Sequence, residues 1–250
     1  MLTKNTVKRI TSLHITKYRY QYDTFIAEGP KLVDEILYSN LNIVELYHTK
    51  DWYHPRMEKV NVSTLVTSDE MRSISALTTP SHVLAVIEIP KYDIADIDPQ
   101  NQLIIALDTI QDPGNLGTII RLADWFGIDS ILCSTDTVDI FSPKVVQASM
   151  GAITRVKVFY CHLASELAKT KGDAPIYGTF MEGENIYTTN LNSTGIIIMG
   201  NEGKGISPEI EKLVTQKIHI PTFAKDRSIV ESLNVAMATA IVCSEFRRRN

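Results

Sequence analysis

From residue 103 onward, short apolar runs that are typical of buried strands alternate with stretches of helical period. The runs lie at about residues 103–108, 130–134, 155–160, 175–180, 195–199 and 217–220. A helix between two strands returns the chain to the starting edge of the sheet, so strands connected in this way run parallel. The alternation therefore predicts an α/β fold with a mostly parallel sheet and helices on both of its faces.

A smaller α/β region precedes this alternation. Pro30 lies at the start of one helical pattern, and Thr67 with Glu70 forms a capping box at the start of another. The stretch 91–102 is polar and acidic and is interrupted by Pro99, which makes it the best candidate for a domain boundary. We therefore expect two domains, which comprise residues 1–95 and residues 96–250.

The beginning of the chain is basic, although the net charge of the whole chain is −4 and does not point to a nucleic-acid partner. No acidic residue precedes Asp23. The positive residues of this arm and the tyrosines between them are Lys4, Lys8, Arg9, Lys17, Arg19, Tyr18, Tyr20 and Tyr22. This pattern is typical of an RNA-contacting arm, but a solvent-exposed amphipathic helix would look the same.

Cysteines and hydropathy indicate the compartment. Cys133, Cys161 and Cys243 are scattered and follow no metal-ligand spacing. No apolar run approaches the ~20 residues that span a membrane, and the N-terminus lacks the apolar centre of a signal peptide. We expect a cytoplasmic protein in a reducing compartment, without a metal site or a membrane partner.

The first of three polar loops follows the strand at 103–107. Asn115 or Gly114 can cap the helix from Leu116 to Phe126. Arg121 lies off the apolar face of that helix and within its first two turns, so it can point toward the strand ends. In the simpler interpretation, Asn115 only caps the helix and Arg121 is a surface charge.

The second loop is rich in glycine and contains Gly200, Gly203 and Gly205. It matches neither a P-loop nor a dinucleotide fingerprint, because Ile206 and Pro208 occupy positions that those motifs reserve for Lys and Gly. The glycines predict a close approach of the backbone to a ligand. The carboxylate of Glu202 would repel phosphate, so a cationic or hydroxyl-bearing ligand fits better.

The third loop joins Ile220-Pro221 to a C-terminal helix that begins at Ser232. Asn234 falls in the first turn, whose free N–H groups can face a ligand. The helical period predicts a buried stripe of Leu233, Ala236, Met237, Ala240 and Ile241. An ordinary capped C-terminal helix would show the same pattern.

In this order, the three loops resemble the motifs of the SpoU (TrmH-type) branch of the SPOUT RNA methyltransferases. The residues that match are Asn115, Arg121, Glu202, Ser232 and Asn234, and the resemblance covers residues 103–247. More loosely, residues 25–33 and 83–86 resemble the small α/β RNA-binding domain that often precedes this fold. One departure is the segment Thr222–Glu231, which is longer than the usual connection within the third motif.

The resemblance implies methyl transfer from S-adenosylmethionine to a ribose 2′-hydroxyl of structured RNA, ribosomal in preference to transfer RNA. It also implies a homodimer and a deep trefoil knot within residues 96–250, with residues 1–95 as the RNA-binding domain. The cofactor-binding residues that it implies are Met199, Gly200, Gly203, Ile220 and Leu233.

Arg121 matches the reactive position of the family, with Asn115, Glu202, Ser232 and Asn234 expected to orient it and the ribose. A guanidinium keeps its proton at neutral pH, so stabilisation of the developing alkoxide is an alternative to the role of general base. Two other functions remain open. One is a non-catalytic RNA-binding or ribosome-assembly factor on the same fold, and the other is an unrelated nucleotide-binding α/β enzyme.

Overall fold

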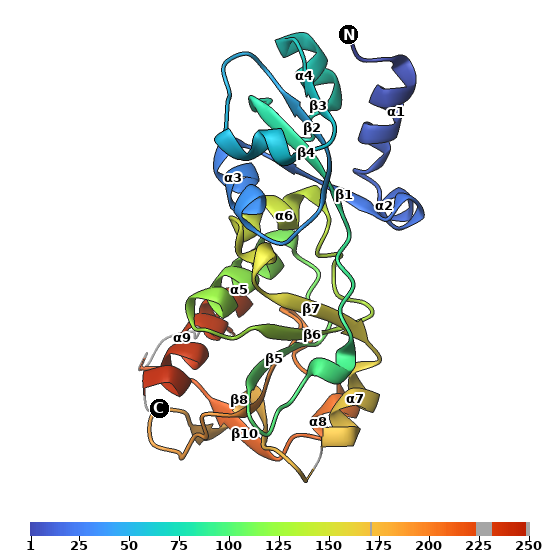
Figure 1. Ribbon diagram of the computed structural model, residues 1–250. Coiled ribbons are helices and arrows are strands. Elements are labelled where there is room, and N and C mark those ends of the chain that lie inside the picture. Colours follow the sequence, from blue (N-terminus) through green and yellow to red (C-terminus); the bar gives the residue numbers. More distant parts are fainter. Residues whose placement is uncertain (171, 224–231, 249–250) are drawn as a thin grey trace. The chain divides into compact units, whose positions relative to one another are not determined.

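The computed structural model of the chain describes residues 1–170, 172–223 and 232–248 (Figure 1). These residues fall into two compact units. The first contains Met1–Lys91 together with Asp139–Arg155, and the second contains Tyr92–Val138 together with Val156–Asn250. The chain therefore passes from one unit to the other at three places.

The first unit is built on a four-stranded sheet of order β1-β4-β2-β3. The strand β4 (Val83–Glu88) pairs antiparallel with β1 (Thr24–Glu28) and β2 (Ile43–His48), and β2 pairs parallel with β3 (Ser63–Leu65). The helices are α1 (Lys4–Ser12), α2 (Thr16–Tyr22), α3 (Pro30–Tyr38), α4 (Ser68–Ile74) and α6 (Pro143–Ser149), with 3₁₀ turns η1 (Pro55–Lys59) and η3 (Ala152–Thr154).

Both predicted helix starts of the first unit are confirmed. Pro30 is the first residue of α3, where its missing N–H leaves no helical hydrogen bond unmade. At α4, the side chain of Thr67 accepts from the backbone N–H of Glu70, and the Glu70 carboxylate accepts from the backbone N–H of Thr67. Local capping chemistry was therefore sufficient to place these two helices.

The segment Asp139–Arg155 differs from the predicted division, which placed it with residues 96–250. It packs inside the first unit, where the ring centroid of Phe141 lies 4.7 Å from that of Phe25. Its buried residues, such as Val145, are apolar and would suit the core of either unit. For this reason the sequence pattern carries no sign of where the segment belongs.

Two cations of the basic arm form ion pairs within the first unit. Arg19 is only 1% exposed and donates to the Asp139 carboxylate at 2.6 Å and to the Leu13 carbonyl at 2.7 Å. Arg9 donates to the Glu45 carboxylate at 2.5 Å. The cations of the arm that stay exposed are Lys4, Lys8 and Lys17.

The second unit is built on a six-stranded sheet of order β10-β8-β9-β5-β6-β7, and every strand pair in it is parallel. This confirms the predicted parallel sheet. The strands are β5 (Leu103–Leu107), β6 (Ser130–Ser134), β7 (Lys157–Cys161), β8 (Ile176–Asn185), β9 (Gly195–Met199) and β10 (Gln216–His219).

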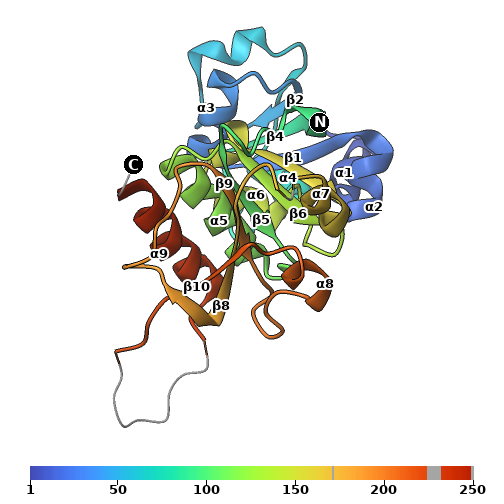
Figure 2. The ribbon, with the colours of Figure 1, turned by 90° about the horizontal axis from the view of Figure 1, so that it is seen from below.

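Helices cover both faces of this sheet (Figures 1 and 2). On one face, α5 (Pro113–Trp125) packs against α9 (Val235–Arg248). The other face carries α7 (Leu163–Thr170) and α8 (Pro208–Glu211), and the turn η2 (Ile94–Asp96) packs there as well. The core on this second face contains Ile104, Ile196, Ile198, Leu163, Leu167 and Ile210. No helix in the described parts of the chain has both the length and the apolar composition that a membrane crossing requires.

Two predicted helix caps are wrong by a few residues. Asp112, and not Asn115 or Gly114, caps α5, because its carboxylate accepts from the backbone N–H of Asn115 at 2.8 Å. At α9 the cap is Asn234 and not Ser232, because the Asn234 side-chain oxygen accepts from the first backbone N–H groups of the helix. The Asp-Pro pair at residues 112–113 was a usable signal for the first of these.

The predicted buried stripe of α9 is wrong at two of its five residues, since Ala236 is buried and Ala240 and Ile241 are half-buried. Leu233 and Met237 are exposed, whereas the buried residues of the helix are Val235, Ala236, Thr239, Val242, Cys243, Glu245 and Phe246. The helix has apolar residues on more than one side, so its period alone could not decide which side faces the sheet. An exposed apolar strip is the result.

The longer connection Thr222–Glu231 lies outside the described residues except for Thr222 and Phe223. The trefoil knot that the resemblance implies stays a prediction.

Candidate active site

The two central strands of the second unit bring two of the three predicted loops together. β5 pairs with β9 in a register that places Leu107 beside Met199, so the loops that follow these strands leave the sheet at neighbouring points. Strand order changes direction here, with β6 and β7 on one side and β8 and β10 on the other. Open parallel sheets bind their ligands at such a switch point.

Two polar residues fix these loops to each other. Asp108 is buried directly after β5, and its carboxylate accepts from the backbone N–H of Ser207 at 2.7 Å. Asn201 follows β9 and donates to the carbonyl of Thr109 at 2.7 Å. Sequence reasoning did not single out Asp108 or Asn201. Their position directly beyond two apolar strands was the signal that could have found them.

Gly200 is required by the loop itself. A Cβ atom at this position would lie 2.3 Å from the backbone carbon of Gly205, a distance that no side chain tolerates. Gly205 has a φ of 69°, in the left-handed region that favours glycine. The close approach at Gly200 is to the backbone of the same loop, so the predicted approach to a ligand stays a prediction. At Gly203, a Cβ atom would meet only the Asn201 side-chain oxygen, at 3.8 Å.

Side chains from all three motifs form one hydrogen-bonded chain, which we call the amide chain. The Asn115 side-chain NH₂ donates to the Glu202 carboxylate at 2.8 Å. The Asn234 side-chain NH₂ donates to the Asn115 side-chain oxygen at 3.0 Å. The Asn234 oxygen accepts from the backbone N–H groups of Ala236 and Met237 at 3.0 and 3.2 Å. Residues more than one hundred positions apart are thus held in line.

The direction of the amide chain is set by its two ends. A carboxylate can only accept, and the free N–H groups at a helix start can only donate. Both amides must therefore turn their NH₂ groups toward Glu202 and their oxygens toward α9. Glu202 and Asn234 are exposed and Asn115 is half-buried, so a ligand can reach all three.

Arg121 and Ser232 stand outside the amide chain. Arg121 is exposed on α5, as predicted, and lies six residues beyond Asn115, which corresponds to about 9 Å along a helix axis. Neither side chain makes a hydrogen bond or an ion pair within residues 1–170, 172–223 and 232–248. The structure therefore unites Asn115, Glu202 and Asn234, and leaves Arg121 and Ser232 with open polar groups.

The five predicted cofactor-binding residues lie at the ends of two strands and before α9. Met199 ends β9, Gly200 and Gly203 belong to the loop after it, Ile220 follows β10, and Leu233 precedes the cap of α9. Gly200, Ile220 and Leu233 make no backbone hydrogen bond with the described part of the chain. Backbone groups without partners beside apolar side chains fit the base and ribose of a nucleoside-type cofactor.

A parallel α/β unit with a polar site at the carboxyl ends of its central strands is the arrangement of ligand-binding α/β enzymes. The model of the SpoU rRNA Methylase family matches residues 102–244, which is more than half of the chain. The chain belongs to this family. The model of the MRM3-like substrate binding domain matches residues 4–85.

Proteins similar over their whole length support the same assignment. A protein from Porphyromonas gingivalis that is described as belonging to the TrmH family of RNA methyltransferases is 39% identical, with a TM-score of 0.87 and full coverage of both chains. The AdoMet-bound rRNA methyltransferase from Sinorhizobium meliloti is 30% identical, with a TM-score of 0.87, and covers 100% of this chain and 96% of its own. The 23S rRNA (guanosine(2553)-2'-O)-methyltransferase RlmP from Bacillus subtilis is 29% identical and covers 96% of this chain and 95% of its own.

Proposed function

We propose that this protein methylates a ribose 2′-hydroxyl of ribosomal RNA, with S-adenosylmethionine as the methyl donor. The observation that carries the proposal is the amide chain, because it joins Asn115, Glu202 and Asn234 from the three family motifs at the ligand-binding edge of the sheet. Two of the three relatives named above, from Sinorhizobium meliloti and Bacillus subtilis, are rRNA methyltransferases, which favours ribosomal over transfer RNA as the substrate.

The cofactor-binding role falls to Met199, Gly200, Gly203, Ile220 and Leu233. When bound, S-adenosylmethionine supplies an electrophilic methyl group on a positively charged sulfur. The free backbone groups of Gly200, Ile220 and Leu233 can hydrogen-bond a nucleoside, and the exposed Leu233 side chain can cover its base. Gly203 is exposed, so a ligand can reach it.

The catalytic role falls to Arg121, with Ser232 and the amide chain as positioning groups. The 2′-hydroxyl must lose its proton, to water, before or during its attack on the methyl group, and negative charge develops on its oxygen as that proton leaves. The methyl–sulfur bond breaks as the oxygen–methyl bond forms. The exposed guanidinium of Arg121 can donate two N–H groups to that oxygen without giving up its own proton. Asn115, Glu202, Ser232 and Asn234 can hold the ribose in line by hydrogen bonds, and alignment alone can supply several orders of magnitude in rate.

A homodimer is supported by exposed apolar side chains on α5 and at the start of α9. Trp125 is 84% exposed at the end of α5, and Leu233 and Met237 are exposed at the start of α9. Arg121 and Trp125 are four residues apart, so they share one side of α5. A second copy that covers Trp125 would bring its own residues close to Arg121. Light scattering should therefore give a dimer, and Trp125→Asp should give a monomer with little activity.

The first unit is proposed to hold the RNA, with residues 1–95 as the substrate domain. The exposed Lys4, Lys8 and Lys17 of the arm can contact phosphates, whereas Arg9 and Arg19 already have carboxylate partners. Phosphate contacts of this kind weaken with salt. A cytoplasmic location of the enzyme is part of the proposal, and the bacterial rRNA methyltransferase RlmP among its relatives supports it.

The direct test is methylation of rRNA from cells that lack the gene. The purified protein, radioactive S-adenosylmethionine and a chelator should label one 2′-hydroxyl, and that ribose should be unmodified in the mutant cells. Binding of cofactor and RNA without transfer would instead identify a non-catalytic assembly factor. Calorimetry that shows no saturable cofactor binding at millimolar concentration would contradict the whole proposal.

A further inference from the structure

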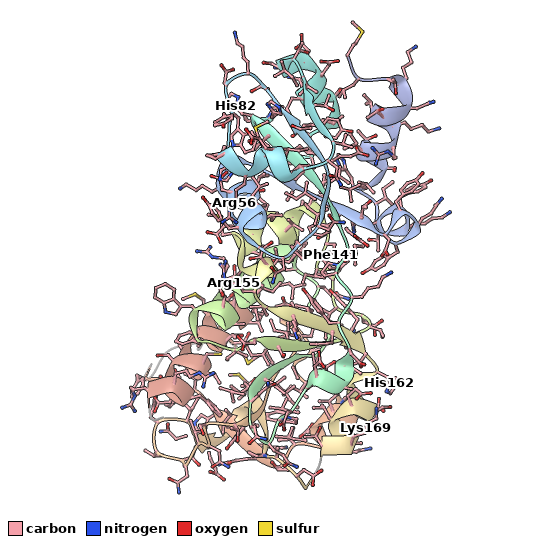
Figure 3. The ribbon with its side chains drawn as sticks, in the orientation of Figure 1. Arg56, His82, Phe141, Arg155, His162 and Lys169 are labelled. Atoms are coloured by element: carbon pink, nitrogen blue, oxygen red, sulfur yellow. The ribbon has the colours of Figure 1, made fainter. Side chains whose placement is uncertain are left out.

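A row of aromatic rings occupies the first unit between β2 and η1. The Tyr38 ring meets the edge of the His54 ring at 5.4 Å, His54 stacks on Trp52 at 6.3 Å with a 15° angle between the planes, and Trp52 lies 6.0 Å from His48. The guanidinium of Arg56 lies 4.0 Å from the centroid of the Tyr38 ring. Figure 3 shows the Arg56 side chain beside α3, the helix that ends at Tyr38.

Packing of the loop explains only part of this row. Trp52 and His54 are each 8% exposed and form the small core beneath the loop. Tyr38 and Tyr53 are 63% and 69% exposed, so they bury little surface and add little to that core. Tyr53 makes no hydrogen bond or ring contact with the described residues. Packing therefore does not explain why Tyr38 and Tyr53 are exposed beside the buried Trp52 and His54.

Two cations, Lys50 and Arg56, share this stretch of chain with two exposed carboxylates, Asp51 and Glu58. Arg56 donates to the Leu37 carbonyl at 3.4 Å, but neither Arg56 nor the exposed Lys50 has a carboxylate partner within the described residues. A guanidinium on an aromatic face keeps most of its N–H groups free for another acceptor. The surface thus pairs open rings with open cations.

We propose that Tyr38, Lys50, Tyr53 and Arg56, here named the ring surface, bind unpaired nucleotides of the RNA substrate. The proposal rests on the proposed function and assigns a substrate contact far in sequence from the catalytic motifs. Bases can stack on the two tyrosines or on the guanidinium plane, because every base has an aromatic face. Phosphates between those bases can contact Lys50 and Arg56.

Unpaired RNA fits the ring surface better than a duplex or a protein does. A duplex hides its base faces inside the stack and would leave Tyr38 and Tyr53 unused. A protein partner would have to place carboxylates on Arg56 and Lys50 and also aromatic side chains on the two tyrosine rings. RNA supplies stacking groups and negative charge in alternation along one strand.

The test uses the full-length protein with two fluorescein-labelled probes, a 20-nucleotide oligouridine and a 20-base-pair RNA duplex. Tyr53→Ala and Tyr38→Ala should each weaken oligouridine binding by about 5- to 100-fold and change duplex binding much less. Tyr38→Phe keeps the ring and should bind like the wild type. Arg56→Ala should weaken binding and also reduce the dependence of affinity on salt by about one phosphate contact.

Matched controls separate the ring surface from general effects. Arg72→Ala removes an exposed arginine of the same unit, and Tyr187→Ala removes an exposed tyrosine of the other unit, so both should bind like the wild type. Tyr53→Ala is the decisive variant because the Tyr53 side chain supports nothing else in the described structure. Cofactor affinity of every variant should be unchanged by calorimetry.

The outcomes distinguish this inference from the proposed function. Wild-type oligouridine binding that survives in Tyr53→Ala and Arg56→Ala overturns the ring surface and leaves the methyltransferase intact. The same holds if those variants lose a protein partner while RNA affinity stays the same. If the wild type binds neither probe and methylates no rRNA, the proposed function itself has failed and the ring surface falls with it.

Discussion

Both units contain hydrogen-bonded polar side chains from distant parts of the sequence, but in opposite settings. In the first unit, the ion pair of Arg19 with Asp139 is shielded from solvent, and removal of one partner would leave the other charge unpaired. In the second unit, the amide chain of Glu202, Asn115 and Asn234 is open to solvent, where each hydrogen bond contributes little to stability. Buried pairs hold the fold, whereas an exposed chain of this precision indicates a ligand.

The largest expected effect breaks the buried pair. Asp139→Ala should lower the free energy of unfolding by about 3–5 kcal/mol, because it leaves the Arg19 guanidinium buried without its carboxylate. Urea denaturation measures this change. Asp69→Ala removes an exposed ion pair with Arg72 and should cost less than about 1 kcal/mol. Equal losses in the two variants would refute the contrast between the units.

The next largest effect is on the methylation rate, with little change in the free energy of unfolding. Arg121→Ala should slow single-turnover methylation by about 100-fold or more at saturating cofactor and RNA, because it removes the donor for the developing alkoxide. The free energy of unfolding should change by no more than about 0.5 kcal/mol, since Arg121 is exposed. Arg121→Lys keeps the charge but loses the planar fork, and should recover only part of the rate. A wild-type rate in Arg121→Ala would make this residue a surface charge.

The amide chain can be cut at two points with different consequences. Asn234→Ala should slow turnover by about 10-fold and also destabilise the protein by about 1 kcal/mol, because Asn234 caps α9. Asn115→Ala should slow turnover to a similar extent with almost no change in stability, because its side chain caps nothing. Single-turnover rates and urea denaturation of both variants provide the comparison. If Asn115→Ala had a normal turnover rate, the amide chain would have no role in catalysis, and Asn234 would serve only as the cap of α9.

The smallest effect depends on pH. Burial raises the pKa of the Glu28 carboxyl above its ordinary value, against the hydrogen bonds from Ser75 and Ala76. A raised pKa in the folded state means that protonated Glu28 favours folding, and that this stability is lost as pH rises through the folded pKa. Glu28→Gln should therefore stabilise the protein slightly at neutral pH, by up to about 1 kcal/mol, and the difference should vanish in acid. Urea denaturation at pH 4 and pH 7.5 tests the sign.

The parallel sheet and the three loops could be predicted because strands that are buried on both faces consist of continuous apolar residues. Residues such as Leu103–Leu107 are buried throughout, and a run of that kind has few other structures available. The family prediction is confirmed by the match over residues 102–244. The motif residues Asn115, Glu202 and Asn234 are brought together, while the catalytic and cofactor roles stay predictions.

The remaining features depend on choices that sequence pattern leaves open. Helix α9 carries apolar residues on two sides, and only the packed structure shows that Val242 is buried and Met237 is not. Segment Asp139–Arg155 is apolar enough for either core. Asp108 and Asn201 act through contacts with Ser207 and Thr109 from another strand end, which no local period can reveal.

The three passages of the chain between the units also limit how this protein can be recombined. The first unit is not a cassette that can be exchanged at the linker near residue 95, because Asp139–Arg155 belongs to the same compact unit. A chimera that replaces only the first 95 residues would remove Phe25 from beneath Phe141 and leave Asp139 without Arg19. Exchange of this unit between relatives therefore requires two separated stretches of sequence to change together, so the unit should diverge by substitution rather than by shuffling of whole domains.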